Sequence, residues 1–335
     1  MAVYTQIGAE ELAALLGEFD VGALISAKGI AEGVSNSNWL VETAGPAANG
    51  PDGTGTRFIL TMYEQRTAIA DLPYFLSLLD HLAARGCPVP RTIHDRDGQL
   101  YRLRPDKIWG AKALALIEFL PGLSVSDPTP AQARAVGAAL AQMHGAAADF
   151  AGTRANSMDL AEWRRLLVAC GPDGLSRIDP DLAGLIEREL PAVAAAWPDD
   201  LPRSVIHADL FPDNVLLRGD AVGGLIDFYF ACNDLSAYDV AVTHAAWCFD
   251  DAGHRFRPAL STALLEGYVS VRPLLPTERA ALPVLARGAA LRFIASRAYD
   301  WLHTPAGALV TRKDPMAFAR RLAFYADPAN AAVFA

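Results

Sequence analysis

The segment 204–217 constrains the fold of this chain more than any other part of the sequence. Apolar residues at 204–206 and at 215–217 predict two short strands, because each run is bounded by polar or turn-forming residues. The turn that joins these strands carries four polar side chains, His207, Asp209, Asp213 and Asn214. A third apolar run at 222–226 follows a Gly-rich turn and ends at Asp227. The sequence therefore predicts carboxylates gathered where short strands end.

The spacing within this segment indicates a chemistry. Asp209 and Asn214 are separated by four residues, as in the catalytic loop of kinases, where the Asp orients the acceptor hydroxyl and the Asn holds Mg²⁺. Asp227 stands where the second metal-binding Asp of such a site is expected. Asp and Asn are also common in ordinary turns, but that explanation does not account for all the spacings together. We therefore expect a site of phosphoryl transfer.

These residues resemble a known superfamily. His207-Ala-Asp-Leu-Phe-Pro-Asp-Asn214 resembles the loop of the aminoglycoside-phosphotransferase and choline-kinase-like superfamily, whose members read His-Gly-Asp or His-Ala-Asp. The stretches 226–241 and 29–38 are similar to the homoserine kinases of that superfamily. The similarity extends from Tyr4 to about Phe324. It implies ATP and Mg²⁺ as cofactors and L-homoserine as the acceptor, with O-phospho-L-homoserine, a precursor of threonine, as the product.

The resemblance implies an α+β, protein-kinase-like fold in two lobes. We expect a small antiparallel-sheet lobe at 1–120 and a larger, mainly helical lobe at 121–335, joined by a hinge near 118–122. The sequence pattern agrees, because strand-like runs at 21–30, 38–43, 57–63, 100–103 and 113–120 precede the helical spacing that starts at Pro130. Helices are expected in the first part at 9–16 and 72–85, and later at 130–147, 160–169, 181–195 and 236–249. The Gly- and Pro-rich stretch 44–55 predicts a hairpin loop.

The nucleotide side of the site is expected in the first lobe. By the resemblance, the loop at 29–38 covers the phosphates and the hinge strand presents backbone groups to adenine. The residues implied in cofactor binding are Gly29, Gly33, Ser35, Ser37, Glu118 and Leu120. A Gly- and Ser-containing hairpin is also an ordinary turn, and the stretch matches neither the P-loop nor the dinucleotide fingerprint.

The sequence departs from the superfamily pattern at the phosphate-binding lysine. Thr61 stands where the third strand should carry that lysine, and Ser77 stands where its Glu partner is expected. Lys112 and Lys28 are candidates for the missing cation, although each also fits a solvated or structural lysine. Mg²⁺ and backbone donors offer another source of charge neutralisation.

The acceptor side is expected around Asp209, the proposed base. His207 is the second catalytic candidate, and we expect it to hold the loop by hydrogen bonds more than to transfer protons. The resemblance implies that Asp239 braces the loop from below. Asn214 and Asp227 are expected to hold the metal, whereas Asp213 either reaches the metal or, as we favour, caps the turn. Homoserine is a zwitterion, so its pocket needs an anion-binding and a cation-binding group. Candidates for these groups are Tyr229, Asn233, Asp234, Arg292, Arg297 and Trp301.

Two alternatives stay open. One is a kinase of the same superfamily with another acceptor, such as choline, ethanolamine, an aminoglycoside or a methylthio-sugar. The other is a catalytically silent nucleotide-binding module, which Thr61 in place of the lysine would favour. The joint presence of Asp209, Asn214 and Asp227 argues against the silent module.

Composition limits the partners. The formal charge of −9 and the pI near 5.3 argue against a nucleic-acid partner. Four well-separated cysteines, an N-terminal stretch without the features of a signal peptide and the lack of a long apolar run predict a reduced, cytoplasmic protein without a membrane span. The sequence makes no prediction of the oligomeric state.

Overall fold

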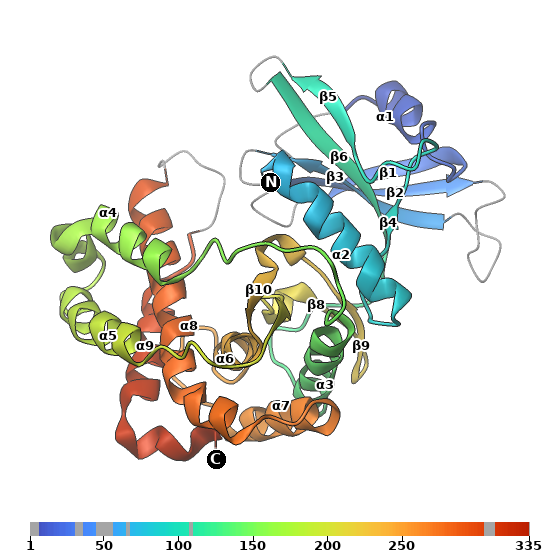
Figure 1. Cartoon of the computed structure of the whole chain (residues 1–335). Coiled ribbons are helices and arrows are strands. Elements are labelled where there is room, and N and C mark those ends of the chain that lie inside the picture. Colours follow the sequence, from blue (N-terminus) through green and yellow to red (C-terminus); the bar gives the residue numbers. More distant parts are fainter. Residues whose placement is uncertain are drawn as a thin grey trace. The chain divides into compact units, whose positions relative to one another are not determined.

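The computed structural model describes residues 7–30, 36–44, 56–64, 68–106, 110–304 and 312–334. The chain divides into two units, Met1–Leu120 and Pro121–Ala335 (Figure 1). Most of the loop predicted at 44–55 lies outside the described residues, as do Gly33 and Ser35.

The first unit is built on an antiparallel sheet. Its strands are β1 (Ala23–Ile30), β2 (Asn36–Ala44), β3 (Thr56–Tyr63), β4 (Thr92–Ile93), β5 (Arg102–Asp106) and β6 (Gly110–Glu118). The strands lie in the order β1-β2-β3-β6-β4, and β5 also pairs with β6. The antiparallel first lobe predicted from the sequence is confirmed, and β5 lies two residues later than expected.

Helix α1 (Ala9–Leu16) covers one face of this sheet (Figure 1). Its apolar side chains Leu12, Leu15 and Leu16 join a buried cluster with alternate residues of three strands, Trp39, Val41, Phe58, Leu60, Met62, Leu114 and Leu116. This alternation is the period-two pattern of a strand with one face buried. Helix α2 (Leu72–Ala84), which follows the short 3₁₀ turn Ile69–Asp71, is fixed to β4 because the Thr92 hydroxyl donates to the Leu76 carbonyl oxygen at 2.9 Å.

The second unit is mainly helical. Its helices are α3 (Pro130–Ala146), α4 (Leu160–Ile178), α5 (Leu182–Ala196), α6 (Ser236–Trp247), α7 (Pro258–Val271), α8 (Pro276–His303) and α9 (Met316–Ala326). Its strands are β7 (Arg203–Ile206), β8 (Val215–Arg218), β9 (Ala221–Leu225) and β10 (Cys232–Leu235). Short 3₁₀ turns occur at Pro212–Asn214, Phe228–Phe230 and Pro328–Phe334.

Helix α6 is the core of the second unit. Every residue of α6 is buried, which explains why it shows no polar face in the sequence. Helix α8 packs against α6, α9 and α4 (Figure 1). Helix α4 is longer than predicted and contains a kink, because Gly171 adopts a left-handed φ of 64° directly before Pro172.

Helices α3 and α7 approach each other through two glycines. A Cβ atom added at Gly137 would lie 2.0 Å from the Leu264 carbonyl oxygen, and one added at Gly267 would lie 2.0 Å from that of Arg134. Either contact is far inside van der Waals distance. Glycine is therefore required at both positions for the helix backbones to lie this close.

Two small antiparallel pairs hold the segment singled out in the sequence. Strand β7 pairs with β10, and β8 pairs with β9. Strand β10 was not predicted, since the sequence 232–235 lacks the β-branched residues that mark strands. The four cysteines are buried free thiols, and no described helix meets the length and hydropathy needed to span a bilayer.

Candidate active site

The predicted catalytic loop is a tight turn between β7 and β8. The Phe211 N–H donates to the Asp209 carbonyl oxygen at 2.9 Å, and the Asn214 N–H donates to the Phe211 carbonyl oxygen at 3.0 Å. Ala208, directly before Asp209, adopts a φ of 63°. This left-handed conformation is unfavourable for a residue with a Cβ atom, so neighbouring groups must hold it.

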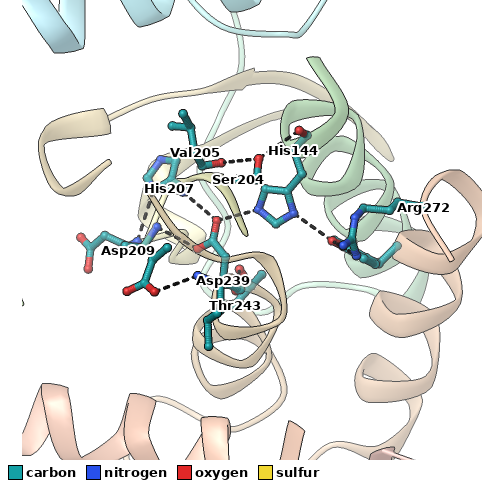
Figure 2. A network of polar contacts seen from close by, with 12 residues as sticks. His144, Ser204, Val205, His207, Asp209, Asp239, Thr243 and Arg272 are labelled. Carbon is teal, nitrogen blue, oxygen red and sulfur yellow. Dashed lines mark hydrogen bonds and ion pairs between the residues drawn. The ribbon is translucent and has the colours of Figure 1, made fainter. Parts of the chain in front are cut away.

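Asp239 of α6 holds this turn from below (Figure 2). Its carboxylate accepts the backbone N–H groups of His207 at 2.7 Å and Ala208 at 2.8 Å. Burial alone would raise the pKa of Asp239, but the hydrogen bond from His144 and the charges and N–H groups around it hold this pKa below its ordinary value. Asp239 is therefore an ionised, fully buried acceptor, in the bracing position that the sequence analysis expected.

A chain of side chains continues from Asp239 (Figure 2). His144 of α3 lies with Nε2 3.0 Å from the Asp239 carboxylate and with Nδ1 2.8 Å from the Tyr268 hydroxyl. Arg272 donates to that hydroxyl at 3.2 Å and pairs with Glu278 at 2.8 Å. Sequence reasoning did not identify His144 or Tyr268, because their connection depends on the packing of α3 against α7.

His207 joins the loop to the strand end that carries Asp227. Its Nε2 lies 2.9 Å from the Ile226 carbonyl oxygen, and its Nδ1 accepts the Asp209 N–H at 3.3 Å. Burial lowers the pKa of His207, so the ring is neutral, with Nε2 as the donor. These contacts fit the loop-holding role that was predicted for His207.

Asn214 is bonded both to the catalytic loop and to Ile226, and Asp227 directly follows Ile226. The Asn214 side-chain amide donates to the Asp209 carbonyl oxygen at 2.8 Å, and the Ile226 N–H donates to the Asn214 carbonyl oxygen at 3.0 Å. Asp227 has a left-handed φ of 66°. Part of the residue reaches solvent, but its carboxyl group is closely surrounded by protein. Desolvation and the negative charges of Asp209 and Asp213 raise the pKa of the Asp227 carboxyl to about 7. A cation bound here would relieve this crowding of negative charge.

The oxygen atoms of this region suit a hard divalent cation. Within the described ranges, no group of three or more His, Cys, Asp or Glu side chains is spaced to hold a metal ion by itself. A metal held by Asn214 and Asp227 would therefore need further ligands from water or phosphate. Mg²⁺ commonly binds in that way.

Arg292 was predicted to bind the acceptor, and the structure places it against the catalytic loop. The side chain is buried, with the residue 2% exposed. Its Nη1 donates to the Ala208 carbonyl oxygen, and its Nη2 lies 3.8 Å from an Asp209 carboxylate oxygen. Arg292 therefore supports the strained Ala208 from the side opposite Asp239. The sequence could not reveal this, because it does not specify which face of α8 is buried.

Asn233 and Asp234 also serve the fold. The Asn233 side chain accepts the Arg154 N–H at 2.8 Å. Asp234 accepts from Asn156 at 2.8 Å and pairs with Arg203 at 3.1 Å. Both residues lie on β10 and hold the segment between α3 and α4 against this strand, and their role toward the acceptor stays a prediction.

Tyr229, Arg297 and Trp301 stay candidates for the acceptor side. Tyr229 is half-buried, two residues after Asp227. Arg297 and Trp301 are four residues apart on α8 and so share one of its faces. The ring of Phe211 lies between Arg297 and Lys313, with its centroid 5.9 Å from Arg297 Cζ and 5.5 Å from Lys313 Nζ. Lys313 and Phe211 were not named in the sequence analysis.

The first unit contains the remaining predicted residues. Gly29 is exposed near the end of β1, and the buried Ser37 hydroxyl donates to Glu64 at 2.8 Å. The hinge residue Glu118 donates its backbone N–H to the Arg91 carbonyl oxygen at 2.9 Å. That N–H is thus already engaged within the unit, and Leu120 is half-buried at its end.

The structure shows what the residue at the expected position of the phosphate-binding lysine contacts, and where Lys112 and Lys28 lie. Thr61 is buried and donates to the Asn38 side chain at 2.8 Å, so it fills the lysine position with a local hydrogen bond. Lys112 pairs with Glu64 at 2.7 Å, and both side chains are largely buried. The first unit therefore contains a lysine–glutamate pair, although its members are contributed by β6 and by the residue after β3. Lys28 is exposed.

Comparison with known proteins matches the chain to a protein family and to individual relatives. A model of the phosphotransferase enzyme family matches residues 26–274. A curated homoserine kinase of Azorhizobium caulinodans is 48% identical over 99% of this chain and 98% of its own length, and one of Rhizobium etli is 48% identical over 100% and 99%. Among solved structures, an amicoumacin kinase bound to AMP-PNP and Ca²⁺ matches with a TM-score of 0.69 and 14% identity over 94% of this chain and 92% of that one. A microcompartment-associated aminopropanol kinase matches with a TM-score of 0.68 and 20% identity over 95% and 96%.

Proposed function

The chain belongs to the phosphotransferase enzyme family, alongside the homoserine kinases, and on this premise we propose that it transfers the γ-phosphoryl group of ATP to the hydroxyl of L-homoserine. The observation that carries the proposal is the near full-length similarity to curated homoserine kinases at 48% identity. The protein-kinase-like fold of the structural relatives supports it. The product, O-phospho-L-homoserine, would be used for threonine synthesis.

Asp209 acts as the base and positioning residue in this proposal. It lies in a turn whose backbone is fixed by Asp239 and Arg292, so its carboxylate is pre-organised before the substrate arrives. The hydroxyl oxygen attacks the γ-phosphorus of ATP while Asp209 accepts the hydroxyl proton. The bond between the γ-phosphorus and the β,γ-bridging oxygen breaks, and ADP leaves with that electron pair. No covalent enzyme intermediate is needed.

Asn214 and Asp227 are the residues that would hold Mg²⁺. Amide and carboxylate oxygens are suitable ligands. Desolvation, and after it the negative charges of Asp209 and Asp213, raise the pKa of Asp227, and a bound cation would stabilise its ionised form. When bound, Mg²⁺ neutralises the charge on the phosphate oxygens. The remaining ligands would be water and phosphate, as is common for Mg²⁺.

Measurement of ADP release tests the proposal. The purified protein is supplied with ATP, Mg²⁺ and one acceptor at a time: L-homoserine, choline, 3-aminopropanol or kanamycin. We expect turnover with L-homoserine at the highest kcat/KM. A higher kcat/KM with choline or kanamycin would mean that this compound, and not L-homoserine, is the acceptor. No turnover with any of the four compounds would favour the silent nucleotide-binding module.

Substitution of Asp209 tests the mechanism. Asp209→Asn should lower kcat by about 10²- to 10⁴-fold, the usual contribution of a positioned base, and leave the affinity for ATP nearly unchanged. Asp220→Asn is the matched control, since Asp220 is exposed in the turn between β8 and β9. If both variants keep full activity, Asp209 is not the base.

A further inference from the structure

Arg297 lies on an aromatic surface that includes Phe211 of the catalytic loop. Its guanidinium carbon is 4.5 Å from the centroid of the Phe318 ring and 5.9 Å from that of Phe211. Phe211 is two residues after Asp209 in the catalytic loop. The aromatic rings restrict the guanidinium to a defined position next to the catalytic loop.

Arg297 makes fewer hydrogen bonds than its N–H groups can donate. An arginine has five N–H donors, and Nη1 donates to the Asp314 carbonyl oxygen at 3.2 Å. In the described part of the chain, no carboxylate oxygen lies within ion-pair distance of Arg297. The residue is half-buried and not fully enclosed, so a small anion can reach the guanidinium.

The other cationic side chains near the catalytic loop contact carboxylates or backbone carbonyl oxygens of the protein. Arg292 is buried and bound to the Ala208 carbonyl oxygen, and Lys313 lies 3.4 Å from the Asp213 carboxylate. Arg321 donates to the carbonyl oxygens of Asp250 and Ala317, at 2.8 Å each. Of these cations near the catalytic loop, Arg297 is the one whose charge is not matched by a carboxylate or buried in backbone contacts.

The electrostatic setting of Arg297 favours an incoming anion. Desolvation and the positive charge of Arg321 lower the pKa of Arg297 to about 10. The group still carries its proton at neutral pH, but its charge is incompletely solvated. A bound carboxylate would supply both a counter-charge and planar acceptors that fit the guanidinium geometry.

We propose that Arg297 binds the α-carboxylate of the acceptor and thereby selects an amino acid over the corresponding amino alcohol. This inference rests on the proposed function. In L-homoserine, three carbon atoms separate the hydroxyl oxygen from the carboxylate carbon, so the carboxylate partner must lie near the catalytic loop. Arg297 meets this requirement, because it contacts Phe211, two residues after Asp209. The site takes a short ω-hydroxy amino acid whose carboxylate is presented to α8.

Two substrates and three variants test this assignment. The substrates are L-homoserine and 3-aminopropanol, which is the same molecule without its carboxylate. The variants are Arg297→Met, Arg297→Lys and the control Arg164→Met, which removes an equal charge from an exposed position on α4. For each protein, kcat/KM is measured with both substrates at saturating ATP, and Tm reports whether the variant is folded.

The expected result is a loss that depends on the substrate. Arg297→Met should lower kcat/KM for L-homoserine by about ten- to a hundredfold, the usual effect of removing a charged hydrogen bond, and should change kcat/KM for 3-aminopropanol less than about threefold. Arg297→Lys should restore part of the preference, because it keeps the charge without the fork of donors. Arg164→Met should behave like the unchanged protein.

Other outcomes overturn the assignment. An equal loss with both substrates would mean that Arg297 acts on the phosphoryl group or on the fold. Unchanged kcat/KM values for both substrates would mean that the carboxylate binds elsewhere. If Arg297→Met does not fold, the Arg297→Lys ratio decides between the same results. Failure of the proposed function gives a different signature, since the unchanged protein would then release no ADP with L-homoserine.

Discussion

The hydroxyl of Tyr268 lies 2.8 Å from Nδ1 of His144, so a tyrosine on α7 contacts the histidine that pairs with the catalytic-loop brace. Both side chains are buried. With Nδ1 occupied by the tyrosine, the histidine presents Nε2 to Asp239. The orientation of one ring therefore connects the packing of two helices to the position of the loop.

Replacing Tyr268 by Phe should affect catalysis as well as stability. The lost hydrogen bond should lower the free energy of unfolding by about 1 kcal/mol, and the less restrained His144 should lower kcat with little change in the KM for ATP. Tyr325→Phe is a matched control, because the Tyr325 hydroxyl lies 2.7 Å from Nδ1 of His244, a buried histidine of α6. Steady-state kinetics and urea unfolding compare the two variants; equal kcat values would contradict the prediction.

Substitutions at Ala208 should follow its left-handed backbone. Ala208→Gly removes the Cβ atom that makes a φ of 63° unfavourable, and this gain offsets the larger entropy of glycine in the unfolded chain. We expect an active protein whose free energy of unfolding stays within about 1 kcal/mol of the original. Ala208→Val should unfold more easily and lose activity. If Val is tolerated as well as Gly, the turn is not strained.

The α3–α7 contact should reject any side chain at Gly137. Ala at this position forces the helix backbones apart, and overpacking of this kind costs about 1–3 kcal/mol. Gly145→Ala on the same helix is the control, since a Cβ atom there meets nothing within 4 Å and Ala stabilises a helix by up to about 1 kcal/mol relative to Gly. Thermal unfolding should therefore move in opposite directions for the two variants, and a shift in the same direction would contradict the prediction.

His244 should make the protein sensitive to mild acid. Burial lowers the pKa of His244 to about 3, whereas an unfolded histidine titrates near 6.5. Below pH 6.5 the unfolded state takes up a proton that the native state does not, so stability falls as the pH decreases toward 3. Between pH 7 and 5 this histidine alone should remove about 2 kcal/mol.

The pH effect is measured by urea unfolding at pH 7 and pH 5. A His244→Gln variant is less stable at pH 7 but should lose about 2 kcal/mol less than the original protein between the two pH values. His207, whose pKa is also lowered by burial, contributes to the loss in both proteins and so does not affect the comparison. An identical pH dependence in the two proteins would show that His244 is not buried in its neutral form.

Much of the candidate site could be predicted because its residues are close in sequence. Asp209, Asn214 and Asp227 lie on strand ends within one continuous segment, and their spacing alone predicts their proximity. The antiparallel first unit was predictable for a similar reason, since alternation along each strand reflects the burial of one face.

The contacts of the acceptor candidates could not be predicted from the sequence, because they depend on distant segments. Which face of α8 turns inward decides whether Arg292 holds the loop or meets a substrate, and that choice is made by packing against α6. Pairing of β10 with β7 decides that Asp234 meets Arg203. The Lys112–Glu64 pair depends on where β6 and β3 come together. Neither the buried face of a helix nor the pairing of distant strands can be predicted from a local sequence pattern.

The attachment of the catalytic turn to α6 gives this loop an unusual dynamic character. Loops commonly exchange their amide hydrogens through small local openings, whereas core helices exchange during global unfolding. The amides of His207 and Ala208 are bonded to a carboxylate that belongs to the fully buried helix at the centre of the second unit. These two amides should therefore exchange as slowly as those of the core. The catalytic loop should lose its structure only when the whole second unit unfolds.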